Sequence, residues 1–421
     1  MPEQTRCGLS STWRRPFFTI WVGQQVSLIG SQVAQFAIVW WLTVTTGSAT
    51  VLAVGTLVAL MPQIVLGPIA GVLVDRWDRR RVMIVADLCI ALVSLTLAVL
   101  FILGWVQVWQ VYLALFARAV GGAFHWPAMT ASTSLLVPKE QLARIAGLNQ
   151  IMNGGLNIAC PAMGAFLISI LPLSGVMFVD VATAIMGIGP LLFIPIPRPP
   201  RAANRGGASI WSDLAEGLRY VRAWPALVLM IAMAILVKVA LTPAFSLLPL
   251  LVRNHFQGGP SQLGAFEALF GVGVVAGGLL LGGWGGFRRK IRTIQLGILV
   301  LGVGITALAF VPGHLFLAGL ACLFVMGFGI PLVDGPFLAI LQTTVPPDIQ
   351  GRVFGVTFSL LSLSSPLGLV LAGPLSDRLG LPIWYAAAGV LALLLGSVGF
   401  LIPTLVRIEA GSGKATGNAE S

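Results

Sequence analysis

The sequence predicts an all-α membrane protein with twelve transmembrane helices, arranged as two pseudo-symmetric bundles of six helices. Three observations support this fold class. Only 9% of the 421 residues are charged, whereas soluble globular domains carry about 25%. Apolar runs such as 82–103 and 381–402 are long enough to cross a hydrocarbon core of about 30 Å. The second half of the chain also repeats landmark residues of the first half at a constant offset.

Twelve segments are apolar enough to be spans. The 50 Gly and 26 Pro do not contradict this, because both residues are common in transmembrane helices. The predicted spans are 17–42, 51–74, 82–103, 108–127, 146–170, 175–194, 225–249, 261–284, 293–311, 315–339, 353–375 and 381–402.

The basic residues predict the orientation. If both termini are cytoplasmic, most of the 25 Lys and Arg fall in inside segments, and the outside loops hold Arg253 and Arg378. Positive residues are retained on the cytoplasmic side of a membrane. We therefore expect a multi-pass protein of the inner (cytoplasmic) membrane. The net charge of +11 is then topogenic and does not indicate a nucleic-acid partner.

The two halves match at an offset of 209 residues. The matching pairs are Pro16 and Pro225, Gly55 and Gly264, Pro127 and Pro336, Pro138 and Pro347, Gly164 and Gly373, and Gly187 and Gly396. The basic triplet that begins at Arg79 also falls on the one that begins at Arg288. An even number of spans per half makes the repeats parallel, with a substrate path between them.

These features divide the chain into four parts. The first six-helix half covers 1–197, a cytoplasmic linker 198–224, the second half 225–405, and a disordered cytoplasmic tail 406–421. Within the linker, Ile210, Leu214, Leu218 and Val221 recur at helical spacing. This pattern predicts an amphipathic helix on the cytoplasmic membrane surface.

The loop between the second and third spans carries a motif. Gly71, Asp75, Arg76, Arg79 and Arg80 follow the order Gly-x-x-x-Asp-Arg-x-x-Arg-Arg, which resembles the signature loop of the major facilitator superfamily, with Asp78 replacing a glycine. The resemblance implies an inward gate. Gly71 would allow two helices to approach closely, and Asp75 would sit at a helix N-terminus, where the dipole favours an acidic residue.

Two further motifs lie inside spans. Arg118 is near the middle of span four, where an Arg costs at least ~2.5–3.5 kcal/mol, so it should face an aqueous cavity or a carboxylate. Arg118 and Gly121 resemble the Arg-x-x-Gly element of proton-coupled antiporters in this superfamily. Cys160, Pro161 and Gly164 in span five resemble its antiporter motif. Backbone hydrogen bonding of Arg118 and ordinary small-residue packing in span five are the alternatives.

The other ionisable residues inside the spans are Asp87, Asp180, Lys238, Glu267 and Asp334, with His125 near the inner end of span four. Lys238 and Glu267 are expected at a similar depth on adjacent helices. They would form either a static ion pair or a site where Glu267 exchanges a proton.

In the superfamily fold, helices one, four, seven and ten line the cavity. This implies that Arg118, His125, Lys238 and Asp334 line it, and that Asp87 and Asp180 matter less. Among the carboxylates we rank Glu267, Asp334 and Asp180, in that order, as binding the driving proton, with Arg118 beside them.

A closer resemblance is to the macrolide-efflux branch of the superfamily and its siderophore-exporter relatives. It is carried by residues 20–29, by Phe124-His-Trp-Pro-Ala128, by residues 276–282 and by Gly351-Arg-Val-Phe354.

The resemblance implies a secondary transporter that exports a bulky amphipathic compound, such as a macrolide-like drug, by proton antiport. The alternatives are a siderophore or metabolite exporter and an importer or facilitator of the same fold. A membrane sensor or enzyme is disfavoured, because the three His are far apart, no HExxH or other metal spacing is present, and no soluble segment exceeds about 30 residues. We expect no metal, no cofactor and a monomer, with protons, membrane lipid and one small amphipathic substrate as partners.

Overall fold

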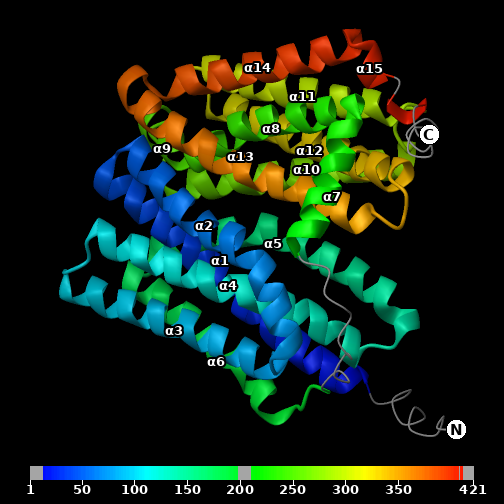
Figure 1. Ribbon diagram of the computed structural model, residues 1–421. Coiled ribbons are helices and arrows are strands. Elements are labelled where there is room, and N and C mark those ends of the chain that lie inside the picture. The colour runs from blue at the N-terminus through cyan, green and yellow to red at the C-terminus, as the bar shows by residue number, and fades with distance from the viewer. Residues whose placement is uncertain (1–12, 198–209, 407, 411–421) are drawn as a thin grey trace, which may run out of the picture. The chain divides into compact units, whose positions relative to one another are not determined.

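The structure, a computed structural model, describes residues 13–197, 210–406 and 408–410. This part of the chain is helical and contains no strand (Figure 1). The helices before residue 198 are α1 (Arg14–Thr46), α2 (Ala49–Arg76), α3 (Arg79–Leu103), α4 (Val108–Leu136), a 3₁₀ turn (Lys139–Gln141), α5 (Leu142–Ile170) and α6 (Leu173–Phe193).

The later helices include short ones between long ones. They are α7 (Ile210–Ala223), α8 (Pro225–Ser246), α9 (Leu248–Asn254), α10 (Pro260–Trp284), α11 (Lys290–Phe310), α12 (Phe316–Thr344), α13 (Gln350–Leu379), α14 (Leu381–Leu401), α15 (Pro403–Val406) and a 3₁₀ turn (Ile408–Ala410). Pro225 and Pro260 stand in the first turns of α8 and α10, where no backbone donor is lost.

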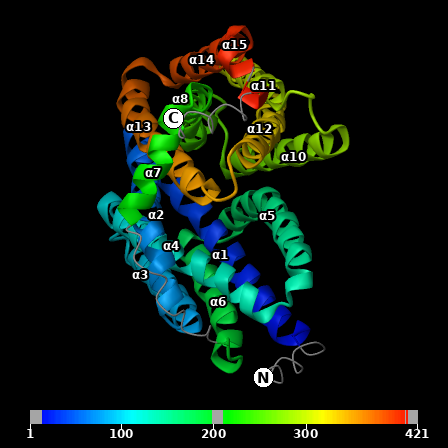
Figure 2. The ribbon, with the colours of Figure 1, turned by 45° about the vertical axis from the view of Figure 1, so that its right-hand side comes forward.

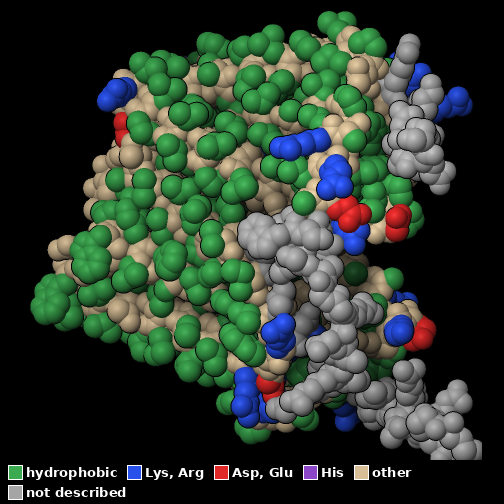
Figure 3. All heavy atoms as spheres, viewed as in Figure 1, with side chains coloured by type: hydrophobic (Ala, Val, Ile, Leu, Met, Phe, Trp, Pro, Cys, Tyr) green, Lys and Arg blue, Asp and Glu red, His purple; other side chains and the backbone are tan. Residues whose placement is uncertain are grey.

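The prediction of an all-α membrane protein is confirmed. Within the described residues, eleven helices are long and apolar enough to cross a membrane. The remaining long helix, α4, has 29 residues and contains Arg118 and His125, which lower its mean hydropathy. Hydrophobic side chains cover most of the face shown in Figure 3, as expected for helices surrounded by lipid.

The chain forms two compact units. The first comprises Met1–Thr45 and Gly55–Ala203, and the second comprises Thr46–Val54 and Asn204–Ser421. The start of α2 therefore belongs to the second unit. Within the predicted tail 406–421, Val406 is the last residue of α15 and Ile408–Ala410 form a 3₁₀ turn, so these residues are not disordered. The rest of the tail and residues 198–209 of the predicted linker lie outside the described residues, so those boundaries stay predictions.

In the first unit, α3 packs against α4 and α6 (Figure 1). Glycines bring α1 close to α6: a Cβ on Gly187 would lie 2.8 Å from the Cβ of Ser27, and one on Gly23 would lie 3.0 Å from the carbonyl oxygen of Met186. Small residues between α1 and α6 thus let polar side chains on neighbouring helices meet.

Gly104 ends α3 in the left-handed conformation, with φ of 69°, which glycine adopts without steric cost.

In the second unit, α11 packs against α12 and α14, and α12 packs against α10 (Figure 2). In this unit the backbones of α10 and α12 come close to each other. A Cβ on Gly277 would lie 2.3 Å from the carbonyl oxygen of Phe328, and one on Gly327 would lie 2.1 Å from that of Phe270. The α10–α12 seam therefore depends on the absence of side chains at these positions.

The predicted helix in the linker is present as α7. It packs against α13, where Glu216 accepts from Arg352 across 2.8 Å in an exposed ion pair. Val221 is buried. A Cβ on Gly217 would lie 2.7 Å from the backbone oxygen of Arg352. These contacts show that α7 is attached to the second unit, while its position on a membrane surface stays a prediction.

Candidate functional site

A buried ion pair joins α4 to α6 in the first unit. Nη1 of Arg118 lies 2.5 Å from Oδ2 of Asp180, and the Asp180 side chain is fully buried. The hydroxyl groups of Ser31 and Ser94 donate to this carboxylate across 2.9 and 2.6 Å. Arg118 also donates to the backbone oxygen of Ser31 and to the hydroxyl of Ser94. Arg118 therefore faces a carboxylate, as the cost of an Arg inside a span requires.

A second polar cluster lies on α1, α3 and α4. The amide nitrogen of Gln24 donates to Oδ2 of Asp87 across 3.0 Å and to the carbonyl oxygen of Gly187 across 3.1 Å. Nε2 of His125 lies 2.6 Å from the amide oxygen of Gln24 and 3.3 Å from Oδ1 of Asp87. Asp87 and Gln24 are both buried. Three helices thus converge on one carboxylate.

Both clusters open on the same cavity, which has a volume of about 350 Å³. Arg118, Asp87 and His125 line it. Much of the remaining lining is polar and comes from α1 and α2: Gln24, Ser27, Ser31, Gln32, Gln35 and Gln63. Asp87 belongs to the third span, which was not among the helices expected to line the cavity. That expectation is wrong for Asp87, because its side chain lines this cavity beside His125.

The basic residues of the loop anchor α3 to its neighbours. The Arg79 guanidinium donates to the carbonyl oxygen of Ala131 in α4 across 2.9 Å. Arg80 donates to the carbonyl oxygens of Leu191 and Leu192 in the last turn of α6. These carbonyls have no partner within their helix, and the negative end of the helix dipole favours a cation there.

The same loop contains two acidic residues, Asp75 and Asp78. Asp75 lies in the last turn of α2, and its side chain is outside the described part of the structure, so its dipole contact stays a prediction. Asp78 is the N-cap of α3 and accepts from the Arg81 amide across 3.3 Å. No described heavy atom comes within 4 Å of a Cβ built on Gly71. Arg76 is exposed.

We expect Arg80→Ala to lower the melting temperature of the purified protein. The substitution leaves two α6 carbonyl oxygens without their donor, which should cost about 1–2 kcal/mol. Arg81→Ala is the matched control, because the Arg81 side chain is 81% exposed and its ion-pair partner among the described residues, Asp78, lies 3.9 Å away. Equal melting temperatures for the two variants would show that the Arg80 contacts contribute nothing.

The span-five motif lies on α5. Cys160 and Gly164 are buried, and Pro161 is inside the helix. A Cβ on Gly164 would lie 2.8 Å from the Phe36 ring of α1. The small residues of this motif therefore provide close packing between α5 and α1, and an antiporter role for Cys160, Pro161 and Gly164 stays a prediction.

In the second unit, Lys238 of α8 and Asp334 of α12 line one cavity of about 180 Å³. Gln295 lines the same cavity and is fully buried, and within the described residues neither of its amide atoms has a hydrogen-bond partner. His125 and Asp334, which correspond under the offset of 209 residues, each line a cavity in their own unit.

The predicted pairing of Lys238 with Glu267 is wrong. Lys238 shares its cavity with Asp334, and the described residues offer Glu267 neither a hydrogen-bond partner nor an ion-pair partner. The physical reason is packing: α8 packs against α13 and α14, whereas α10 packs against α12. Similar depth in the membrane does not make two helices neighbours.

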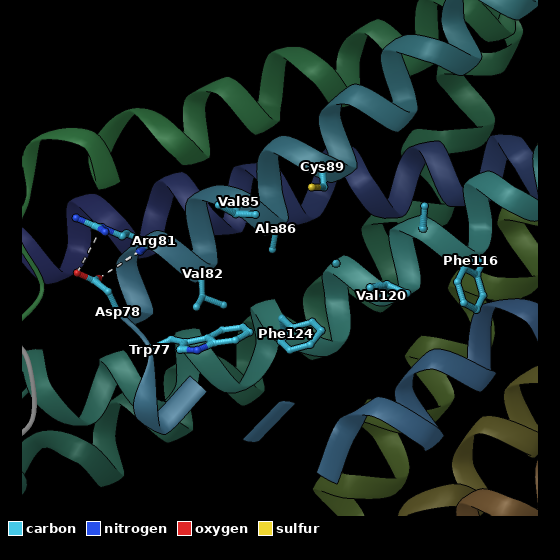
Figure 4. A pocket seen from close by; sticks show the side chains of 12 residues that line it. Trp77, Asp78, Arg81, Val82, Val85, Ala86, Cys89, Phe116, Val120 and Phe124 are labelled. Atoms are coloured by element: carbon cyan, nitrogen blue, oxygen red, sulfur yellow. Dashed lines mark hydrogen bonds and ion pairs between the residues drawn. The ribbon is translucent and has the colours of Figure 1, made fainter. Parts of the chain in front are cut away.

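An apolar cleft of about 800 Å³ runs between α3 and α4 (Figure 4). The Trp77 ring stacks on Phe124 at 6.2 Å and 19°. Asp78 and Arg81 are the only charged residues in its lining, and Figure 4 shows them together at one end. The cleft is therefore a hydrophobic surface feature, distinct from the polar cavity.

Sequence analysis missed Asp377 near the end of α13. Its carboxylate accepts from the Ser48 hydroxyl and from the amides of Ala49 and Thr50, across 2.9, 2.7 and 3.0 Å. It thereby caps the first turn of α2, which belongs to the same compact unit. The sequence contains one indication of such a cap: Ser48 precedes the start of a helix, where the free backbone amides require an acceptor.

Known proteins resemble this chain along most of its length. The family model of the Major Facilitator Superfamily matches residues 20–369. Macrolide efflux protein A of Streptococcus pyogenes is 34% identical over 399 residues, which are 95% of this chain and 98% of that protein. The multidrug efflux pump Tap of Mycolicibacterium fortuitum is 29% identical over 419 residues, 96% of this chain and all of that protein.

Solved structures show the same fold. A bacterial homologue of the human lysosomal transporter Spinster superposes with a TM-score of 0.72 at 14% identity, covering 96% of this chain and 99% of its own. A bacterial homologue of the iron transporter ferroportin gives 0.66 at 15% identity, covering 91% of this chain and 98% of its own. The family predicted from the sequence is thus confirmed: the chain is a transporter that belongs to the major facilitator superfamily.

Proposed function

We propose that this protein exports a bulky amphipathic compound, of the macrolide or multidrug kind, across the cytoplasmic membrane in exchange for protons. The observation that carries the proposal is the 34% identity to a macrolide efflux protein over 95% of the chain. Both termini are cytoplasmic in this proposal, in line with the distribution of basic residues.

The buried charges support proton coupling. Arg118, Asp180 and Asp87 are buried within helices that cross the membrane. Such residues are costly in hydrocarbon and commonly mark ion or proton pathways. Asp180 is the structural partner of Arg118, whereas the described residues provide no guanidinium partner for Asp87, Glu267 or Asp334. For an uncharged substrate, one proton driven by ~100 mV supplies about 2.3 kcal/mol, enough for a roughly fifty-fold gradient. Exchange of a proton for a singly protonated substrate moves no net charge and is driven by the pH gradient alone.

The test uses a drug-sensitive host without its main efflux pumps. Cells that express the protein should accumulate less radiolabelled macrolide than cells with the empty vector, and a protonophore should abolish the difference. Higher accumulation in the expressing cells would instead indicate an importer or facilitator. A difference that survives the protonophore would contradict proton coupling.

A further inference from the structure

The cluster of Gln24, Asp87 and His125 has a defined direction of hydrogen bonding. Nε2 of His125 faces two oxygen acceptors, one on Gln24 and one on Asp87, so this nitrogen carries a proton. The amide nitrogen of Gln24 uses its two protons on Asp87 and on the carbonyl oxygen of Gly187. The network therefore fixes the orientation of the Gln24 amide and leaves both oxygens of Asp87 as acceptors.

The charge of the Asp87 carboxylate has no permanently charged partner of its own in the cavity lining. Arg118 lines the same cavity, but its positive charge is already neutralised by Asp180 of α6, whose Oδ2 lies 2.5 Å from Nη1 of Arg118. Residues of α1 and α2 contribute amides, hydroxyls and apolar groups to the cavity, with no charged side chain. His125 is thus the one titratable partner of Asp87 in the cavity lining.

Charge counting gives the pair two states. With one shared proton, Asp87 and His125 are neutral together, either as carboxylate with imidazolium or as carboxylic acid with imidazole. Without it, the pair carries a net charge of −1. A net charge at this depth is costly, so the pair holds its proton until another positive group compensates the carboxylate.

The cavity gives access to the pair. The Asp87 side chain is 6% exposed and that of His125 is 21% exposed, and both line the cavity of about 350 Å³. A protonated amine on an amphipathic compound in this cavity can balance the charge of Asp87. Proton and amine then compete for one negative charge, which is the requirement for exchange.

From this geometry we propose that Asp87 and His125, oriented by Gln24, bind the proton that the transporter exchanges for a basic amphipathic substrate. This inference rests on the proposed function and names the residues that perform its coupling step. It places the exchanged proton in the first unit, on a pair that the sequence ranking did not include. Glu267 and Asp334 of the second unit are then not the coupling carboxylates.

The test measures coupled and uncoupled transport separately in proteoliposomes. With the lumen one pH unit more acidic than the medium, liposomes with the wild type should approach an about tenfold lumenal excess of radiolabelled macrolide faster than protein-free liposomes do. Protein-free liposomes are essential, because a weak base also enters an acidic lumen unaided. Counterflow of labelled against unlabelled macrolide, without a pH gradient, then measures substrate exchange alone.

Asp87→Asn should lose the accumulation driven by the pH gradient and retain counterflow. His125→Gln preserves the carboxylate and removes the histidine that shares its proton, so it should change the dependence of accumulation on pH. Asp348→Asn changes an exposed carboxyl of the second unit that has no part in the proposed machinery, so it is the matched control and should behave as the wild type in both assays. Retained counterflow shows that each variant is folded.

The outcomes separate the two proposals. If the wild type accumulates macrolide and Asp87→Asn does so equally, the assignment of the proton to this pair is wrong and antiport itself stands. An unchanged pH profile in His125→Gln overturns the role of the histidine and also contradicts the pair. If the wild type shows counterflow but no response to the pH gradient, the proposed proton antiport fails, whatever the variants do.

Discussion

Asp180→Asn is expected to prevent stable folding. Asp180 is fully buried and accepts from Arg118, Ser31 and Ser94. The amide would leave the Arg118 guanidinium without a counter-charge, and breaking a buried pair in this way costs about 3–5 kcal/mol. Fluorescence-detected size-exclusion chromatography of the tagged protein should therefore show an aggregated or greatly reduced peak for this variant.

The matched control removes both charges. Asp180→Asn combined with Arg118→Gln leaves no isolated buried charge, and neutral replacement of a buried pair is far less harmful than breaking it. The double variant should recover a substantial part of the monodisperse peak. A wild-type profile for Asp180→Asn alone would contradict the structural role of the pair and return Asp180 to the candidates for proton binding.

Gly277→Ala is expected to destabilise the second unit strongly, whereas Gly278→Ala should be neutral or slightly stabilising. The added Cβ at Gly277 would lie 2.3 Å from the backbone oxygen of Phe328, and backbone cannot move aside as a side chain does. Separating α10 from α12 should cost at least about 1–3 kcal/mol. Gly278 has nothing within 4 Å of its Cβ position, so it is a control only one residue away.

The measurement for this pair is thermal unfolding of the purified variants in the same detergent. Gly277→Ala should melt at a lower temperature than the wild type, and Gly327→Ala should do the same, because its Cβ would lie 2.1 Å from the Phe270 oxygen. Equal melting temperatures for Gly277→Ala and Gly278→Ala would show that the α10–α12 seam relaxes without cost.

The long helices were predictable because the bilayer fixes their minimum length and their composition. Helix ends were less predictable. The fourth span was predicted to end at residue 127, but α4 continues to Leu136. Hydropathy reports which residues can lie in hydrocarbon, whereas a helix continues beyond it wherever capping and packing allow. The helix α7 was predictable for another reason, since its amphipathic period of 3.6 residues is a local property.

The partners of the buried charges were only partly predictable. That Arg118 required a carboxylate follows from its cost in the membrane, but the choice of Asp180 depends on the rotation of α6 about its axis. Helices that are apolar all round carry little periodicity to reveal that rotation. For the same reason the sequence does not reveal that Asp87 lies beside His125 or that Lys238 shares a cavity with Asp334.

The central claim of proton-coupled export is tested most directly by counting protons released on substrate binding. Purified wild type in weakly buffered detergent is titrated with macrolide adjusted to the same pH, while an indicator dye follows the pH. If proton and substrate compete, binding must expel protons by reciprocal linkage, and about one proton per bound macrolide should appear at saturation. Full macrolide binding with no proton release, and an affinity independent of pH, would contradict the account.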